Sequence, residues 1–161
     1  GAELILPAGF EQLSYFGRGP HGSYCDMRGA TWLGEFSTTV SAHFHPHIRP
    51  QENLAHDETR WVALQNKEGE TLYALSCAKP LSFNCAHFDA EQLTRIRHNH
   101  LLVPRKETVL NLDYRHNGIG SYSCGPKLPE RYRFNEKEFR FTFRLLAAGK
   151  GEIDPYEEFG K

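Results

Sequence analysis

Three histidines at alternate positions, His43, His45 and His47, have a spacing that is compatible with metal binding. Alternate residues of a β-strand share one face, so a strand here would present three imidazoles together, and imidazole nitrogen is a common zinc ligand. The competing interpretation is a solvated edge strand, because Pro46 lacks the backbone N–H that a central strand needs. No cysteine or carboxylate stands at an obvious complementary spacing, so we favour the edge strand and predict no metal site.

Acidic side chains are available for hydrolytic chemistry, but their spacing does not identify a catalytic pair. Glycoside hydrolysis requires two carboxyl groups that face each other across the scissile bond, one of them often held protonated. Ser123-Cys124-Gly125 also lacks the Gly-x-Ser-x-Gly pattern of a nucleophile elbow. We therefore predict that the chain holds no catalytic residue of its own. The carboxylates considered are Asp26, Glu52, Asp57, Glu58 and Asp113.

Three loops combine glycine and proline with polar side chains. They are residues 17–20 (Gly-Arg-Gly-Pro), 49–53 (Arg-Pro-Gln-Glu-Asn) and 118–126. Glycine permits positive φ and close approach, and proline restricts the backbone beside it. Such loops can hold a neighbouring segment or a sugar hydroxyl, and the alternative is that they are turns alone.

Short alternating runs between turn residues predict the strands that position these loops. A short helix is predicted near 89–98, because Asp89 is a suitable N-cap and Gln92 completes a capping box. The charged segment 66–69 predicts the turn of a hairpin. The predicted strands are 4–6, 10–16, 61–65, 71–76, 108–114 and 138–146.

The run 138–146 alternates with period two, so Phe139, Phe141 and Phe143 share a face that another layer must cover. This pattern predicts one all-β domain over 3–148, an antiparallel β-sandwich. A polar, acidic and loosely held tail is expected over 149–161.

Composition excludes several classes of protein. The 161 residues carry 19 basic and 20 acidic side chains, for a net charge of -1, without the basic excess that nucleic-acid binding requires. No apolar run approaches the ~20 residues of a membrane span, and no signal peptide is evident at the N-terminus. We therefore expect no membrane partner and a cytoplasmic protein, with a periplasmic or exported parent as the alternative. Cys25, Cys77, Cys85 and Cys124 show no CxxC spacing and are expected to be unpaired.

Several motifs, in one unbroken order over residues 4–146, resemble the small-chain domain of β-galactosidases of glycoside hydrolase family 2. They agree independently, which makes the resemblance more specific than any single loop. The motifs are Tyr15-Phe16-Gly17-Arg18-Gly19-Pro20, Tyr24 with Asp26 and Arg28, Ile48-Arg49-Pro50-Gln51-Glu52-Asn53, Thr59-Arg60-Trp61-Val62-Ala63-Leu64, Leu112-Asp113-Tyr114, Gly118-Ile119-Gly120-Ser121, Ser123-Cys124-Gly125-Pro126 and Leu128-Pro129.

The resemblance implies half of a C-terminal supersandwich domain similar to galactose mutarotase. The catalytic glutamates and the parent enzyme's Mg²⁺ and Na⁺ would belong to a (β/α) barrel outside this chain, so this chain alone would bind no cofactor. The domain would pack against that barrel and lend the 118–126 loop to the rim of the galactose pocket. Some family members carry a tryptophan where Cys124 stands, which implies a narrower sugar contact here.

The resemblance assigns two sets of residues. The expected substrate-rim residues are Tyr122, Ser123, Cys124 and Gly125, and the expected loop-bracing or interface residues are Arg18, Arg49, Glu52 and Asn53. His45 and His47 stand where apolar residues or tyrosine are usual in the family, which counts further against a metal site.

The expected function is that of an accessory domain, inactive alone, in a retaining β-galactosidase. Its expected partners are the barrel and other domains of the parent, a β-galactoside substrate, and further copies in a homo-oligomer. The alternative is a free-standing carbohydrate-binding sandwich in which exposed Trp32 or Tyr122 stacks on a sugar. Half a supersandwich leaves faces and edges uncovered, so we also expect dimerisation or an exposed apolar patch.

Overall fold

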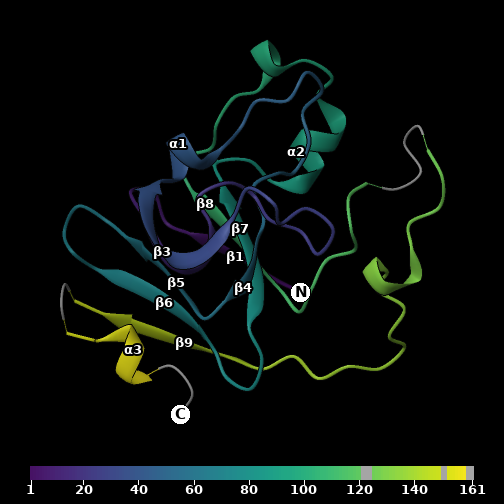
Figure 1. The fold of residues 1–161 in the computed structure, drawn as a ribbon. Helices are drawn as coiled ribbons and strands as arrows, with labels where there is room; N and C mark the ends of the chain where they lie inside the picture. Colours follow the sequence, from purple (N-terminus) through teal and green to yellow (C-terminus); the bar gives the residue numbers. More distant parts are fainter. Residues whose placement is uncertain (121–124, 150–151, 159–161) are drawn as a thin grey trace.

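Two antiparallel sheets pack face to face in the computed structural model, which describes residues 1–120, 125–149 and 152–158 (Figure 1). This arrangement confirms the predicted all-β antiparallel sandwich. The four-stranded sheet has the order β1 (Ala2–Leu6), β8 (Thr108–Asp113), β7 (Leu81–Ala86) and β4 (His56–Thr59). The five-stranded sheet has the order β3 (Trp32–Thr39), β2 (Gln12–Gly19), β5 (Trp61–Gln65), β6 (Thr71–Ser76) and β9 (Phe143–Ala148).

The helices of the described residues are short and lie in connections between strands. They are α1 (Val40–His43), α2 (Ala90–Arg95), α3 (Pro155–Glu158) and the 3₁₀ turns η1 (Asn99–Leu101) and η2 (Glu130–Tyr132). The helix predicted near 89–98 is confirmed as α2, and the carboxylate of Asp89 accepts the Gln92 N–H at 2.7 Å. The helix ends earlier than predicted, because Ile96 already has an extended backbone.

The main core lies between the sheets and follows the period of the strands. In β2, alternate residues point inward, so Leu13 and Tyr15 are buried. Phe83 of β7 and Leu110 of β8 meet them from the other sheet. The hairpin of β5 and β6 has the predicted bounds, with a turn at 66–69.

A second apolar cluster lies on the outer face of the five-stranded sheet. Trp61 and Leu75 are buried there, with Ile153 packed against the cluster. The ring of Tyr156 in α3 lies 5.8 Å from that of Trp61, edge to face. The described part of the tail therefore packs against the sheet, whereas the sequence predicted that the tail is loosely held.

Strand β1 begins two residues earlier and β8 ends one residue earlier than predicted, and two other strand predictions were further off in their bounds. The strand expected at 10–16 is β2, which continues through Gly19, because Gly17 and Gly19 pair with Gly34 and Trp32 of β3. The strand expected at 138–146 is β9, which begins only at Phe143, where its partner β6 ends at Ser76. Residues 138–142 have no partner strand, and Phe139 stacks on Tyr114 instead.

The prediction of a strand carrying His43, His45 and His47 was also wrong. His43 ends helix α1 and is buried, and no strand includes the other two histidines. Thr39 caps this helix by accepting the Ala42 N–H, so the chain turns inward just before His43.

Candidate functional site

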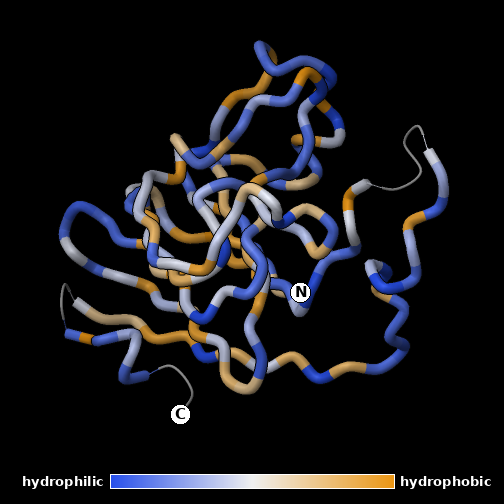
Figure 2. The backbone as a smooth tube through the Cα atoms, in the orientation of Figure 1, coloured by the Kyte–Doolittle hydropathy of each residue, from blue (hydrophilic) through white to orange (hydrophobic). Residues whose placement is uncertain are grey.

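The segment between β8 and β9 leaves the sandwich as a long arm. Figure 1 shows this arm, in green at the right of the view, extending from the end of β8 and returning to β9, with η2 along its course. Its backbone is mainly hydrophilic, in contrast to the strands of the core (Figure 2). The arm carries the 118–126 loop, of which residues 121–124 lie outside the described residues.

Asp26 holds the first part of this loop. Its carboxylate accepts the backbone N–H of Ile119 at 3.0 Å and that of Gly120 at 2.9 Å. Gly118 also donates its N–H to the carbonyl of Tyr132, at 3.0 Å, on the returning side of the arm. The loop therefore starts from a point where three consecutive backbone N–H groups are held by hydrogen bonds.

Asp26 lies in the turn between β2 and β3, where Cys25 forms a second link to the arm. The Cys25 thiol donates to the carbonyls of Tyr132, at 3.4 Å, and His116, at 3.8 Å. Burial and the neighbouring Asp26 carboxylate raise the pKa of this thiol, which keeps it protonated and able to donate.

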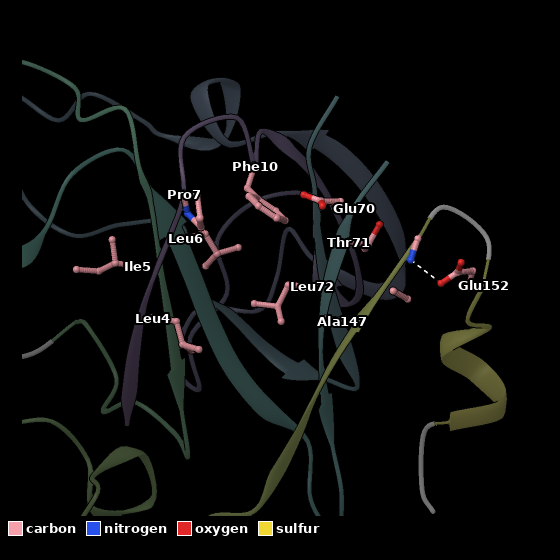
Figure 3. Close-up of a pocket in the computed structure, with 12 residues that line it drawn as sticks. Leu4, Ile5, Leu6, Pro7, Phe10, Glu70, Thr71, Leu72, Ala147 and Glu152 are labelled. Carbon is pink, nitrogen blue, oxygen red and sulfur yellow. Dashed lines mark hydrogen bonds between the residues drawn. The ribbon is translucent and has the colours of Figure 1, made fainter. Parts of the chain in front are cut away.

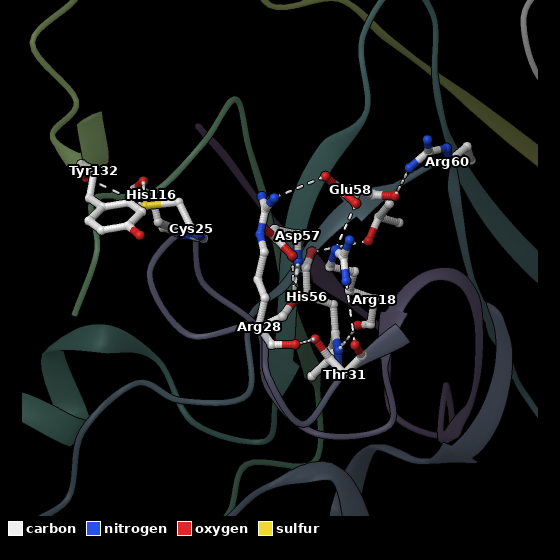
Figure 4. Close-up of polar contacts among 12 residues, drawn as sticks. Arg18, Cys25, Arg28, Thr31, His56, Asp57, Glu58, Arg60, His116 and Tyr132 are labelled. Carbon is white, nitrogen blue, oxygen red and sulfur yellow. Dashed lines mark hydrogen bonds and ion pairs between the residues drawn. The ribbon is translucent and has the colours of Figure 1, made fainter. Parts of the chain in front are cut away.

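Ion pairs join the same turn to the sandwich. Figure 4 shows Arg28 extending toward Asp57 and Glu58 of β4. The Arg28 Nε lies 2.8 Å from the Asp57 carboxylate and its Nη1 lies 3.1 Å from that of Glu58. Glu58 also accepts from Nε of Arg18 at 2.7 Å, and Ser23 donates to Asp57 at 2.6 Å. Two arginines thus share one carboxylate, and the turn that carries Asp26 is held to β4.

The backbone of β4 is irregular where it supplies these carboxylates. Glu58 has a φ of 53°, in the left-handed region, and the pairing of β4 with β7 shifts register between His56 and Thr59. A bulge of this kind redirects side chains on an edge strand. Here both Asp57 and Glu58 contact the arginines.

A polar pocket of about 410 Å³ adjoins this network. Its lining includes Tyr24, Arg28, Glu58, Lys79, His116 and Glu136. Charges of both signs and two aromatic rings could contact a polar ligand or a protein surface. The carboxylates Asp57 and Glu58 are both ion-paired, and no opposed hydrolytic pair is apparent in this lining.

An apolar groove of about 620 Å³ opens between the edge strands β1 and β9 (Figure 3). Leu4 and Leu6 line it from β1, and Leu72 and Ala147 line it from the other sheet. At its rim the Gly149 N–H donates to the Glu152 carboxylate at 2.7 Å. This lining suits packing rather than acid–base chemistry.

The predicted bracing residues lie in two places. Arg18 belongs to the ion-pair network, whereas Arg49 and Glu52 are exposed on the loop before β4. Asn53 holds that loop together, because its side chain accepts the His45 N–H at 3.1 Å and donates to the His45 carbonyl at 2.8 Å.

The predicted rim residues Tyr122, Ser123 and Cys124 lie outside the described residues, and Gly125 is exposed. The carboxylates Asp26, Asp57, Glu58 and Asp113 each contact a donor of the chain. None of them pairs with another to form a hydrolytic site.

No group of three or more histidine, cysteine or acidic residues could hold a metal ion within the described part of the chain. His45 and His47 lie close, with ring centroids 5.1 Å apart, but His43 contacts His56 instead.

Cys25, Cys77 and Cys85 are free thiols. Among the same described residues, no helix is long and apolar enough to cross a membrane.

Sequence reasoning missed the link between Asp26 and the 118–126 loop. The two segments are 93 residues apart in the chain, so no local spacing could pair them. The one available signal was the pair of glycines, Gly118 and Gly120, because glycine often marks the close approach of another group.

Comparison with known proteins shows what the chain is similar to. The family model described as beta galactosidase small chain matches residues 1–145. A β-galactosidase of Staphylococcus xylosus is 42% identical over 145 residues, and one of Actinobacillus pleuropneumoniae is 36% identical over 146 residues. These matches cover 90% and 91% of the chain, but the chain spans only 14% of each relative. A β-galactosidase of Kluyveromyces lactis is 28% identical over 145 residues, again 14% of its length.

Proposed function

Because the chain belongs to the β-galactosidase small-chain family, we propose that it is an accessory domain of a β-galactosidase. The parent enzyme is a glycoside hydrolase that releases terminal β-D-galactosyl residues from galactosides such as lactose. The observation that carries this proposal is the 42% identity over nine-tenths of the chain to a β-galactosidase of which the matched residues make up only 14%. The chain alone is inactive in this proposal.

The catalytic chemistry belongs to a barrel outside this chain. Retaining hydrolysis requires two carboxyl groups about 5–5.5 Å apart, one acting as nucleophile and the other as acid and then base. The carboxylates of Asp26, Asp57, Glu58 and Asp113 are engaged by donors instead. They also do not suit the proposed Mg²⁺ and Na⁺, since the described residues include no metal-binding group. No step of the reaction is assigned to a cation on this domain.

The domain's own contribution is the 118–126 loop at the substrate rim. Support comes from the contacts at the loop's base, where Asp26 accepts two backbone N–H groups. The ion pairs of Arg28 with Asp57 and Glu58 hold Asp26's turn in place. A loop fixed at its base loses less conformational entropy when it contacts a sugar.

The domain packs on the barrel and on neighbouring domains in this proposal, and the parent is a cytoplasmic homo-oligomer. The apolar groove between β1 and β9 supports a packed neighbour, because Leu4, Leu6 and Leu72 line an opening at the unpaired edges of both sheets (Figure 3). Exposed Ile5 on β1 extends this apolar surface.

The first test is the size of the native polypeptide, measured by immunoblotting with an antibody to this domain. A band several times larger than 18.4 kDa that hydrolyses a chromogenic β-galactoside supports the proposal. A band near 18.4 kDa contradicts it.

The role of the loop is tested in that parent enzyme with Asp26→Ala. Loss of the loop's anchor should lower kcat/KM by about tenfold or more, since displacement of about 1 Å at a substrate contact can cost that much. The control is Gly29→Ala on the same turn, where a Cβ meets no atom within 4 Å. Equal activity of the two variants would show that the anchored loop does not contribute to the reaction, and the family assignment would still stand.

A stand-alone sugar-binding sandwich remains the second candidate, and exposed Trp32 favours it. This indole is 59% exposed on edge strand β3, where it could stack on a sugar ring. Titration of the isolated chain with galactosides, followed by calorimetry, distinguishes the two. Binding that Trp32→Ala abolishes would favour the second candidate.

A further inference from the structure

The imidazoles of His43 and His56 meet inside the sandwich and form a buried site that the proposed function does not use. His43 is 5% exposed at the end of α1, and His56 is fully buried at the start of β4. Their Nε2 atoms lie 2.8 Å apart. Each Nδ1 faces a backbone carbonyl, at 3.1 Å from Cys85 for His43 and at 2.7 Å from Arg18 for His56. Figure 4 labels His56 and Arg18 beside the ion-pair network.

These contacts determine how many protons the two rings need. A carbonyl oxygen only accepts hydrogen bonds, so Nδ1 of each ring must carry a proton. The two Nε2 atoms can form a hydrogen bond only if one of them is also protonated. Three contacts therefore require three protons, whereas two neutral imidazoles carry two. We propose that His43 and His56 form a proton-binding site, which holds a third ring proton between the Nε2 atoms and carries one positive charge at neutral pH.

Other occupants of the site fit less well. In a neutral pair, one of the three contacts brings two lone pairs together, which leaves buried polar atoms unsatisfied. A doubly charged pair places two N–H groups against each other. A zinc ion between the rings would hold its two nitrogen ligands about 3.3 Å apart, given tetrahedral geometry and Zn–N distances of about 2.0–2.1 Å, and the observed 2.8 Å is shorter.

The surroundings of the pair are apolar or neutral. From β2, the ring of Tyr15 lies 4.4 Å from that of His56, and from β7 the Cys85 thiol lies 3.9 Å from Nδ1 of His43. Burial raises the pKa of the Tyr15 hydroxyl and of the Cys85 thiol, and the Glu11 carboxylate raises that of Cys85 further, so both groups stay neutral at neutral pH. The charged neighbours along the chain are already paired: Arg18 with Glu58, and Asp57 with Arg28.

Burial opposes a positive charge on either ring, whereas the three hydrogen-bond contacts require the third proton. It lowers the pKa of His56 to about 3, with a further contribution from His43, while the Arg18 carbonyl acts in the opposite direction. Burial also lowers the pKa of His43, against the Cys85 carbonyl. With one added proton every ring N–H has an acceptor, because the two carbonyls accept from the Nδ1 atoms and one Nε2 accepts from the other; a second added proton would have no acceptor.

The shared proton links four parts of the fold. The rings connect α1 to β4, and their outer nitrogens contact the backbones of β7 and β2. His56 directly precedes Asp57 and Glu58, which hold Arg28 and Arg18. Loss of the proton would leave two lone pairs facing each other and weaken the link between α1 and β4.

Nitrogen-15 NMR of the isolated chain counts the ring protons directly. At pH 7.5 we expect both Nδ1 atoms to be protonated and the two Nε2 atoms to share one exchange-protected proton. Two neutral rings, with two protons in total, would overturn the proposal.

Unfolding measured between pH 6.5 and 9 gives a second test, because the two protonation states predict different slopes. A folded pair that keeps one extra proton is most stable near pH 6.5, and its unfolding constant rises by up to tenfold per pH unit until the proton is lost. A neutral pair instead gains stability as the pH rises from 6.5 to about 8, because the unfolded histidines lose their protons over that range, and it gives no slope above it. His56→Gln replaces the charged donor with a neutral amide and should abolish the loss of stability with rising pH. His45→Gln, at an exposed position, should retain that loss. A wild-type slope equal to that of His56→Gln would contradict the proposal even if the variant is less stable.

Discussion

No side chain fits at Gly118, because a Cβ there would lie 2.5 Å from Cγ of Asp26. The short Asp26 side chain cannot move aside freely, since its two oxygens accept the N–H groups of Ile119 and Gly120. The glycine and the carboxylate therefore depend on each other, although the chain separates them by more than ninety residues.

Gly118→Ala should displace Asp26 and destabilise the domain by about 1–3 kcal/mol, the usual range for overpacking. Urea unfolding measures the loss, and faster amide exchange at Ile119 and Gly120 would locate it. Gly125→Ala is the matched control in the same loop, because a Cβ there meets no atom within 4 Å. Equal stability of the two variants would show that the close contact carries no energy.

Asp89→Ala should destabilise α2, because Asp89 caps this helix by accepting the Gln92 N–H at 2.7 Å. Loss of an N-cap typically costs about 1 kcal/mol. Asp89→Ser retains a capping oxygen but removes the ion pair with Arg105, so it separates the two contributions. We expect the serine variant to recover most of the stability in thermal unfolding. If it is as unstable as the alanine variant, the loss of stability comes from the ion pair with Arg105 and not from the cap.

Stability should fall in acid as Glu11 is protonated. Burial raises the pKa of this carboxyl, but hydrogen bonds from Ser41 and His87 outweigh it, and the net direction is downward from 4.5. A lowered carboxyl pKa contributes stability above pH 4.5, and that contribution is lost as pH falls through the folded-state value. Glu11→Gln should be less stable than wild type at pH 7, and the difference should shrink below pH 4.5. The side chain is partly exposed, so the effect is at most about 1 kcal/mol. A difference that stays constant with pH would exclude this carboxyl as the source.

Tyr156→Ala should loosen α3 from the sheet. The ring packs edge to face on Trp61, and its hydroxyl donates to Glu35 at 2.8 Å. We expect the free energy of unfolding to fall by about 1 kcal/mol, which is typical of one aromatic pair. The fluorescence emission of Trp61 should shift to the red, because water reaches the indole. Trp32→Phe provides a background in which Trp61 is the remaining tryptophan. In that background, Tyr156→Phe should keep the emission unchanged, because it removes the hydroxyl alone; an unshifted spectrum in the alanine variant would show that α3 does not cover Trp61.

Local patterns in the sequence determined the fold class and several elements. The apolar runs on either side of the charged turn at 66–69 predicted β5 and β6 with their observed bounds, and Asp89 with Gln92 predicted the start of α2. These features depend on residues within one hairpin or one helical turn, so adjacent side chains suffice to specify them. The family resemblance likewise follows from ordered motifs along the chain, and the match over residues 1–145 confirms it.

Tertiary pairing decided the rest. The sequence placed His43 on a strand with His45 and His47, but a helical turn after Thr39 buries it against His56. The glycine-rich segment after Phe16 was expected to be a loop, yet β3 extends β2 through Gly19 by supplying backbone partners. Asp26 became the anchor of the 118–126 loop only because the arm returns to the turn before β3. Hydrogen bonds between segments far apart in the chain leave no periodic pattern in the sequence. They are determined only by the assembly of the sheets.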